Sequence, residues 1–138
     1  MSILGNRVLR VEDTRLLTEG GRYVADLQDP RLDGAVHATY VRATLAHAEI
    51  TGIAVSDAMA APGVVAVLTG ADLPETRLGR FLLDIPILAR DRVRFVGEKV
   101  VAVAADSPDI AEEALTLIDV QYEELPAVFD PREAMQED

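Results

Sequence analysis

The sequence contains neither cysteine nor tryptophan, and aromatic residues make up only 4 % of its 138 residues. Without cysteine the chain can form no disulfide, no thiolate zinc site and no cysteine-held iron–sulfur cluster, and it has no cysteine nucleophile. Positive charge is also scarce, because Lys99 is the one lysine and the net charge is −11. Nucleic-acid affinity comes largely from Lys and Arg that neutralise phosphates, so we expect no nucleic-acid partner.

Long apolar runs are missing as well. No segment approaches the roughly 20 apolar residues that a membrane-spanning helix needs, and residues 1–7 lack the apolar stretch of a secretion signal. We therefore expect a soluble, cytoplasmic protein with no membrane partner. Hydrophobic residues make up 49 % of the chain, enough for an ordinary core in a domain of this length.

The negative charge is distributed unevenly along the chain. Residues 1–100 carry 12 basic and 13 acidic groups, a net of −1, whereas residues 101–138 carry 1 basic and 11 acidic groups, a net of −10. We interpret the acidic end as a solvated face, with contact to a basic partner as the alternative.

Residues that could perform chemistry are few and do not form a known pattern. The histidines are His37 and His47, which could lie close together if their strands pair, but no neighbouring ligands complete a metal site. His47-Ala48-Glu49 matches the H-x-E of zinc deaminases, whose P-C-x-x-C partner a chain without cysteine cannot supply. No serine lies in G-x-S-x-G and no glycine-rich phosphate loop occurs. The sequence therefore predicts no catalytic, cofactor-binding or metal-binding residue.

Alternation and helical spacing predict an α+β fold with a mixed sheet, one main helix and short helical turns. The main helix starts at Pro108 with Ser107 as its cap, and Ser56 and Thr69 are expected to cap shorter turns. Gly52 suggests a bulge, and the short link 43–47 favours an antiparallel pair between the first two strands. The expected strands are 34–42, 48–55, 64–68 (buried), 93–95, 99–105 (apolar on both faces) and 119–122.

Three parts of the chain differ in character. Residues 1–33 are polar, and we interpret them as an N-terminal arm with short extended pieces around residues 22–25. Residues 34–130 are expected to form the domain, and residues 131–138 are expected to fray. Within the domain, residues 74–92 form a long irregular loop, and loops of this length usually have a functional or interface role. Arginines gather in and just after it, and we expect either a solvated loop or a docking surface made by Arg77, Arg80, Arg90, Arg92 and Arg94.

Several sequence blocks occur in an order that resembles the start of molybdenum-hydroxylase large subunits, the xanthine dehydrogenase, aldehyde oxidase and carbon monoxide dehydrogenase family. In the block at residues 41–50, Ala43, Thr44 and Glu49 stand where the family usually has serine, proline and arginine. The blocks are R-V-E-D at 10–13, L-L-T at 16–18, G-R-Y-V-A-D at 21–26, V-R at 41–42 with A-H-A at 46–48 and Ile50, P-G-V-V-A-V-L-T-G-A-D-L at 62–73, V-R-F-V-G-E at 93–98, V-V-A-V-A at 100–104 and D-V-Q-Y-E-E-L-P at 119–126.

The resemblance implies the α/β hammerhead, a non-catalytic scaffold and assembly domain near the N-terminus of the large subunit. It also implies that the molybdenum–pterin cofactor and the catalytic glutamate belong to downstream domains of that subunit, and that FAD and iron–sulfur clusters belong to other domains or subunits. No catalytic or cofactor residue is therefore carried over to this chain. The alternative is a stand-alone module that reuses the fold to bind a small molecule or a protein.

Overall fold

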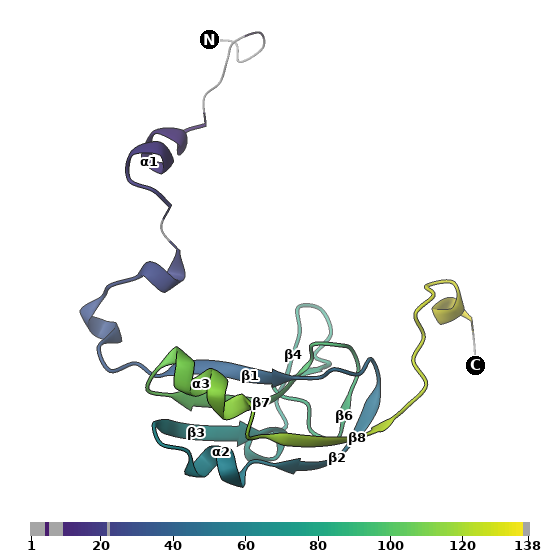
Figure 1. Ribbon diagram of the computed structural model, residues 1–138. Helices are drawn as coiled ribbons and strands as arrows, with labels where there is room; N and C mark the ends of the chain where they lie inside the picture. The colour runs from purple at the N-terminus through teal and green to yellow at the C-terminus, as the bar shows by residue number, and fades with distance from the viewer. Residues whose placement is uncertain (1–4, 6–9, 22, 137–138) are drawn as a thin grey trace. The chain divides into compact units, whose positions relative to one another are not determined.

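The computed structural model describes residues 5, 10–21 and 23–136. Contacts within the chain divide it into two units, residues 1–33 and residues 34–138, which are treated separately. In the described part of the chain, no helix is long and apolar enough to cross a membrane. The ribbon in Figure 1 shows the elements of both units.

The described residues of the first unit contain three short helical pieces, α1 (Asp13–Thr18), η1 (Val24–Asp26) and η2 (Pro30–Leu32). An extended piece was predicted around residues 22–25, and this is wrong for the described residues, because Val24 begins a helical turn. The Asp26 carboxylate closes that turn by accepting the Tyr23 N–H at 2.9 Å. Arg22 lies outside the described residues. A side-chain hydrogen bond from Arg31 lowers the pKa of Asp29.

In the part of the second unit that the structure describes, the strands form three sheets, in which every pair is antiparallel. We call the first sheet A; in it β7 (Lys99–Ala105) lies between β1 (His37–Arg42) and β3 (Val64–Thr69). The predicted strand 99–105 is thus the central strand. Sheet B has the order β6 (Arg92–Val93), β2 (Ala48–Ala54), β8 (Asp119–Glu124), and β4 (Arg77–Leu78) pairs with β5 (Ile85–Pro86).

The predicted pairing of the first two strands is wrong, because β1 and β2 belong to different sheets. Their link is short, but Ala43 is buried and its backbone bonds to a distant turn: its N–H donates to the Glu98 carbonyl, and its carbonyl accepts the Gly97 N–H, both at 2.8 Å. The link therefore carries the chain from sheet A to sheet B. The bulge predicted at Gly52 is present as a register shift between Ile50 and Gly52.

Helix α3 (Pro108–Leu115) starts as predicted, with the Ser107 hydroxyl accepting the Ile110 N–H at 3.3 Å. Thr69 likewise caps η3 (Gly70–Asp72), and its backbone N–H and hydroxyl both donate to the carboxylate of Asp72, which lowers the pKa of that group. The Ser56 cap is wrong, because α2 (Ser56–Ala60) begins at that serine and has no side-chain cap. The last element is η4 (Glu133–Met135).

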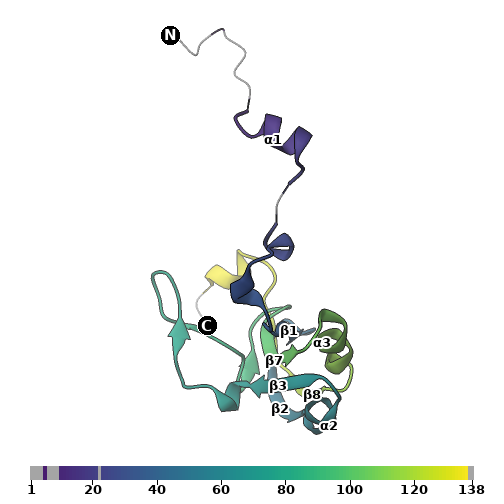
Figure 2. The same ribbon diagram turned by 90° about the vertical axis from the view of Figure 1, so that its left-hand side faces the viewer.

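The core lies on one side of sheet A. Val101 and Val103 of β7 are fully buried there against α2, α3 and sheet B, and burying a valine stabilises the fold by about 1.5–3 kcal/mol. Figure 2 shows α2, α3 and β8 on the same side of this sheet. β3 is an edge strand and is less buried than predicted, since Val65 and Leu68 remain exposed.

Candidate docking surface

Within the second unit, the described residues do not cover the opposite side of sheet A in the same way. Thr39 of β1 donates to Glu112 of α3 at 2.9 Å, so α3 lies on the Thr39 side, where Thr39 pairs with Val103. Neighbouring residues along a strand point to opposite faces, so the other face holds the alternate positions. They are half-buried or exposed, and we call them the open face: Ala38 and Tyr40 of β1, Ala66 and Leu68 of β3, and Ala102 and Ala104 of β7.

Beyond η3, residues 73–91 form the loop that carries the β4–β5 hairpin. Phe81, Leu82 and Leu83 at its tip are 71–89 % exposed. The turn requires glycine at position 79, because a Cβ there would overlap the backbone carbonyl oxygen of Leu82. In Figure 2 the hairpin reaches out on the side of sheet A that faces away from α2 and α3. The exposed apolar tip and the open face thus lie on the same side of the unit.

Gly70 anchors the start of this loop by close backbone approach. A Cβ on Gly70 would lie 2.7 Å from the Ala89 carbonyl oxygen, so no larger residue fits without a shift of the backbone. Ala89 is itself fully buried and donates its N–H to the Lys99 carbonyl at 2.7 Å. Both ends of the loop are therefore fixed on the rigid part of the unit.

The five arginines of the predicted docking surface do not form one cluster. Three of them, Arg77, Arg90 and Arg94, line a pocket of about 260 Å³. Arg80 instead lies over the Phe81 ring, 5.5 Å from its centroid, and Arg92 pairs with Glu49 on the neighbouring strand at 3.6 Å.

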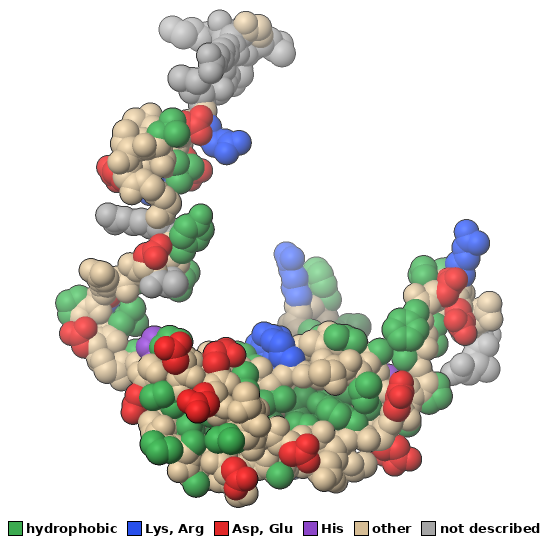
Figure 3. Space-filling view, in the orientation of Figure 1, with side chains coloured by type: hydrophobic (Ala, Val, Ile, Leu, Met, Phe, Trp, Pro, Cys, Tyr) green, Lys and Arg blue, Asp and Glu red, His purple; other side chains and the backbone are tan. Residues whose placement is uncertain are grey.

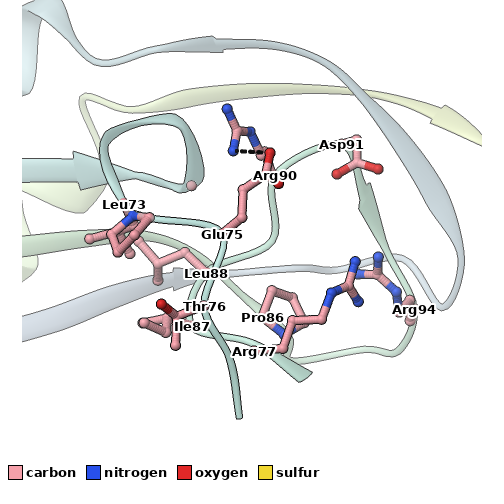
Figure 4. A pocket seen from close by; sticks show the side chains of 12 residues that line it. Leu73, Glu75, Thr76, Arg77, Pro86, Ile87, Leu88, Arg90, Asp91 and Arg94 are labelled. Atoms are coloured by element: carbon pink, nitrogen blue, oxygen red, sulfur yellow. Dashed lines mark hydrogen bonds and ion pairs between the residues drawn. The ribbon is translucent and has the colours of Figure 1, made fainter. Parts of the chain in front are cut away.

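The arginine pocket is lined by both apolar and charged side chains. Arg77 donates to the Asp84 carbonyl at 3.0 Å and Arg90 pairs with Glu75 at 3.1 Å. Figure 4 shows Arg77 and Arg94 pointing toward one another, with the Asp91 carboxylate nearby. The remaining lining residues are Gly70, Leu73, Pro74, Thr76, Pro86, Ile87 and Leu88.

The third pocket arginine is tied to the fold by a buried carboxylate. Glu98 is 5 % exposed and accepts the Arg94 backbone N–H at 2.6 Å and its guanidinium at 3.2 Å. Hydrogen bonds to a charged acceptor are about twice as strong as neutral ones. This double contact closes the turn between β6 and β7. No sequence pattern marked Glu98, although it follows Gly97, which has φ +92°.

The two histidines are far from forming a joint site, because β1 and the start of β2 belong to different sheets. His37 is exposed at the first position of β1. The Nδ1 atom of His47 lies 2.8 Å from the Pro126 carbonyl, and its own carbonyl accepts the Leu125 N–H at 2.9 Å. His47 thus fixes the path by which the chain leaves β8. Among residues 5, 10–21 and 23–136, no three His, Asp or Glu side chains are grouped to hold a metal ion.

A second exposed apolar group surrounds this exit path. Phe95, Val96, Val128 and Phe129 are 53–82 % exposed and lie with His47 around a groove of about 490 Å³. The sequence did not indicate this group, because its members come from segments about 30 residues apart. The surface view in Figure 3 shows hydrophobic side chains reaching the surface at several places, whereas acidic side chains gather over α3.

The family described as "Aldehyde oxidase and xanthine dehydrogenase, a/b hammerhead domain" matches residues 18–126, most of the chain. The chain belongs to this family. The resemblance inferred from the sequence blocks and the hammerhead fold are both confirmed. The match begins at Thr18, inside the first unit.

Known relatives of the hammerhead chain are large subunits of molybdenum hydroxylases. The nicotine 6-hydroxylase large subunit of Paenarthrobacter nicotinovorans is 43 % identical over 144 residues, covering 98 % of this chain and 17 % of its own length. The crystal structure of quinoline 2-oxidoreductase from Pseudomonas putida 86 matches with a TM-score of 0.80 and 48 % identity over 96 % of this chain and 18 % of its own.

A third match is the Cu,Mo-CO dehydrogenase in its carbon monoxide reduced state, with a TM-score of 0.81 and 38 % identity over 97 % of this chain and 17 % of its own. The hammerhead chain therefore spans less than a fifth of the length of each of these three relatives.

Proposed function

We propose that the chain is the non-catalytic scaffold domain of a molybdenum-dependent oxidoreductase large subunit and that it packs against the remaining domains of that subunit. The observation that carries this proposal is the open face of sheet A with the apolar hairpin tip beside it, in a chain that spans less than a fifth of its relatives. Contiguous exposed apolar patches mark sites of interaction with other protein surfaces.

The energetics favour burial of this side. Each large apolar side chain transferred from water into an interface gains about 1.5–3 kcal/mol. Phe81, Leu82 and Leu83 are mostly exposed and supply such area at the tip, while the alanines of the open face allow another backbone to approach closely. Both features suit a large, permanent contact rather than a brief encounter.

The molybdenum–pterin cofactor belongs, in this proposal, to polypeptide outside the chain. The arginine pocket does not fit such a group, because a large anionic cofactor needs convergent donors that are free to bind it. Arg90 and Arg94 are already paired with Glu75 and Glu98, and Arg77 is bonded to the Asp84 carbonyl. We further propose that FAD and iron–sulfur centres are contributed by partner domains or subunits.

The test is reconstitution with a relative. The large chain of quinoline 2-oxidoreductase, expressed without the 18 % that this chain matches, is mixed with the hammerhead chain and analysed by size-exclusion chromatography and calorimetry. We expect a stable complex that Phe81→Ser/Leu82→Ser weakens at least tenfold. Met59→Ser, a change at an exposed site on α2, serves as the matched control and leaves binding unchanged. Failure to form a complex under several buffer conditions would contradict the proposal.

A second candidate function rests on the arginine pocket. Its volume of about 260 Å³ suits a small molecule rather than a large cofactor, and Arg77, which gives one N–H to the Asp84 carbonyl, keeps further donors for an anion, as a stand-alone binding module would require. Thermal-shift screening with anionic metabolites tests this alternative, with Arg77→Gln as the control that removes binding. If no compound stabilises the chain, the binding-module alternative fails and the scaffold role remains the one proposal.

A further inference from the structure

Two cations face each other at the edge of the open face. Arg42 of β1 lies opposite Lys99 of β7 in the strand register, just beyond an irregularity in the pairing. Both side chains reach the ring of Tyr40: the Lys99 Nζ lies 4.6 Å from its centroid and the Arg42 Cζ lies 5.8 Å from it. Both cations are exposed and therefore accessible to a partner.

No carboxylate of the described residues forms an ion pair with either cation. Arg42 donates one guanidinium N–H to the Gly97 carbonyl at 3.0 Å, which leaves further N–H groups of its fork free. Like charges directly opposite each other on antiparallel strands destabilise a sheet. The Tyr40 ring offsets part of this repulsion through cation–π attraction, but it does not neutralise the charge.

Local arrangements that oppose folding are expected at functional sites. Resting on the proposed scaffold role, we infer that the polypeptide that packs on the open face places a carboxylate side chain between Arg42 and Lys99. The anion turns the repulsion between two cations into two attractions. It also fixes the register of the partner on a face of small, nearly featureless side chains.

The surroundings favour a carboxylate of a polypeptide over other anions. The chain carries a net charge of −11, which repels nucleic acids and acidic membrane surfaces. The apolar residues beside the pair, Tyr40 and Ala102, suit the stem of a glutamate or aspartate better than a fully hydrated free ion. A planar guanidinium beside an ammonium matches the two oxygens of one carboxylate.

Binding to the truncated quinoline 2-oxidoreductase chain tests the inference first. Lys99→Met and Arg42→Gln are each expected to weaken the complex at least tenfold and to reduce the dependence of its affinity on salt. In the free chain Lys99→Met should keep the thermal stability, because it removes a like-charge contact together with one cation–π contact. Arg42→Gln also loses the bond to the Gly97 carbonyl, so its binding is measured at a temperature where the free variant is fully folded. The matched control is Arg132→Gln, which removes an exposed arginine that belongs neither to the open face nor to the hairpin.

The results separate this inference from the scaffold proposal. A complex that forms and is insensitive to both changes overturns the carboxylate contact while the scaffold role stands. Variants that weaken binding only because the free chain becomes less stable also overturn it, since Arg42 and Lys99 would then be merely structural.

If no complex forms with the unaltered chain, the scaffold proposal fails. A peptide titration of that chain then decides whether Arg42 and Lys99 bind a carboxylate. The probes are the blocked peptides Ac-Ala-Glu-Ala-NH₂ and Ac-Ala-Gln-Ala-NH₂, followed by amide NMR shifts. Shifts at Arg42 and Lys99 with the glutamate peptide alone support the inference, and equal or absent shifts overturn it. Inorganic phosphate that binds more tightly than the glutamate peptide also overturns it.

Discussion

The replacement of Glu98 by glutamine tests how the turn before β7 is held. Glutamine keeps the shape of the side chain, and its carbonyl can still accept the Arg94 backbone N–H. Its amide group then faces the Arg94 guanidinium, where two donors meet and the charge-assisted bond at 3.2 Å is lost. Losing a hydrogen bond to a charged group costs about 1.5–3 kcal/mol.

Arg94 is 36 % exposed, so water offsets part of that loss and we expect the free energy of unfolding to fall by about 1–2 kcal/mol. Glu98→Ala removes both contacts and leaves the partly buried N–H unpaired, which adds roughly 1–3 kcal/mol to the cost. Urea unfolding followed by far-UV circular dichroism measures both variants.

The chain offers a matched control for this experiment. Glu75 pairs with Arg90 at 3.1 Å, almost the same distance, but the Glu75 side chain is 85 % exposed. An exposed ion pair contributes little, so Glu75→Gln should change the free energy of unfolding by less than about 0.5 kcal/mol. If the two glutamate variants lose equal stability, burial of the carboxylate does not set the strength of the ion pair, and the predicted difference is wrong.

Further predictions concern caps, close contacts and pH. Ser107→Ala should destabilise the chain by about 1 kcal/mol in thermal melts, since its hydroxyl accepts an N–H of α3, while Ser56→Ala, which removes no cap, should have little effect. Gly70→Ala should cost about 1–3 kcal/mol, because its Cβ would meet the Ala89 carbonyl. The lowered pKa of Asp72 contributes stability above pH 3.8 that is lost as the pH falls through the folded-state value, so Asp72→Asn should remove part of the acid sensitivity in urea titrations between pH 6 and pH 3.

Local patterns predicted the elements whose cause is local. The cap at Ser107, the apolar strand 99–105 and the bulge at Gly52 each follow from a few adjacent residues, and all three are present. The separation of β1 from β2 could not be predicted in this way. It depends on hydrogen bonds between Ala43 and the turn at 97–98, more than 50 residues away.

The candidate site was predictable only in part for the same reason. The density of arginines at residues 77–94 predicted a docking loop, and three of the five arginines line one pocket; the docking role itself stays a prediction. The carboxylate that pairs with Arg92 is Glu49, which only the pairing of β2 with β6 brings to it. The unpaired cations at Arg42 and Lys99 were not singled out, because they lie 57 positions apart and meet only through the register of sheet A.

The strongest clue in the sequence was that β7 is apolar on both faces. Strands that are buried on both faces carry such continuous apolar runs, whereas strands with one solvated face alternate. The described residues of this chain bury the Val101 and Val103 side completely and leave the Ala102 and Ala104 side half-buried. On a face that is always in contact with water, polar residues would not lower the stability of the fold. All six positions of the open face nevertheless hold apolar residues. Under the proposed scaffold role, the remaining domains of the large subunit cover the alternate side of β7, and the strand then contributes to two buried contacts.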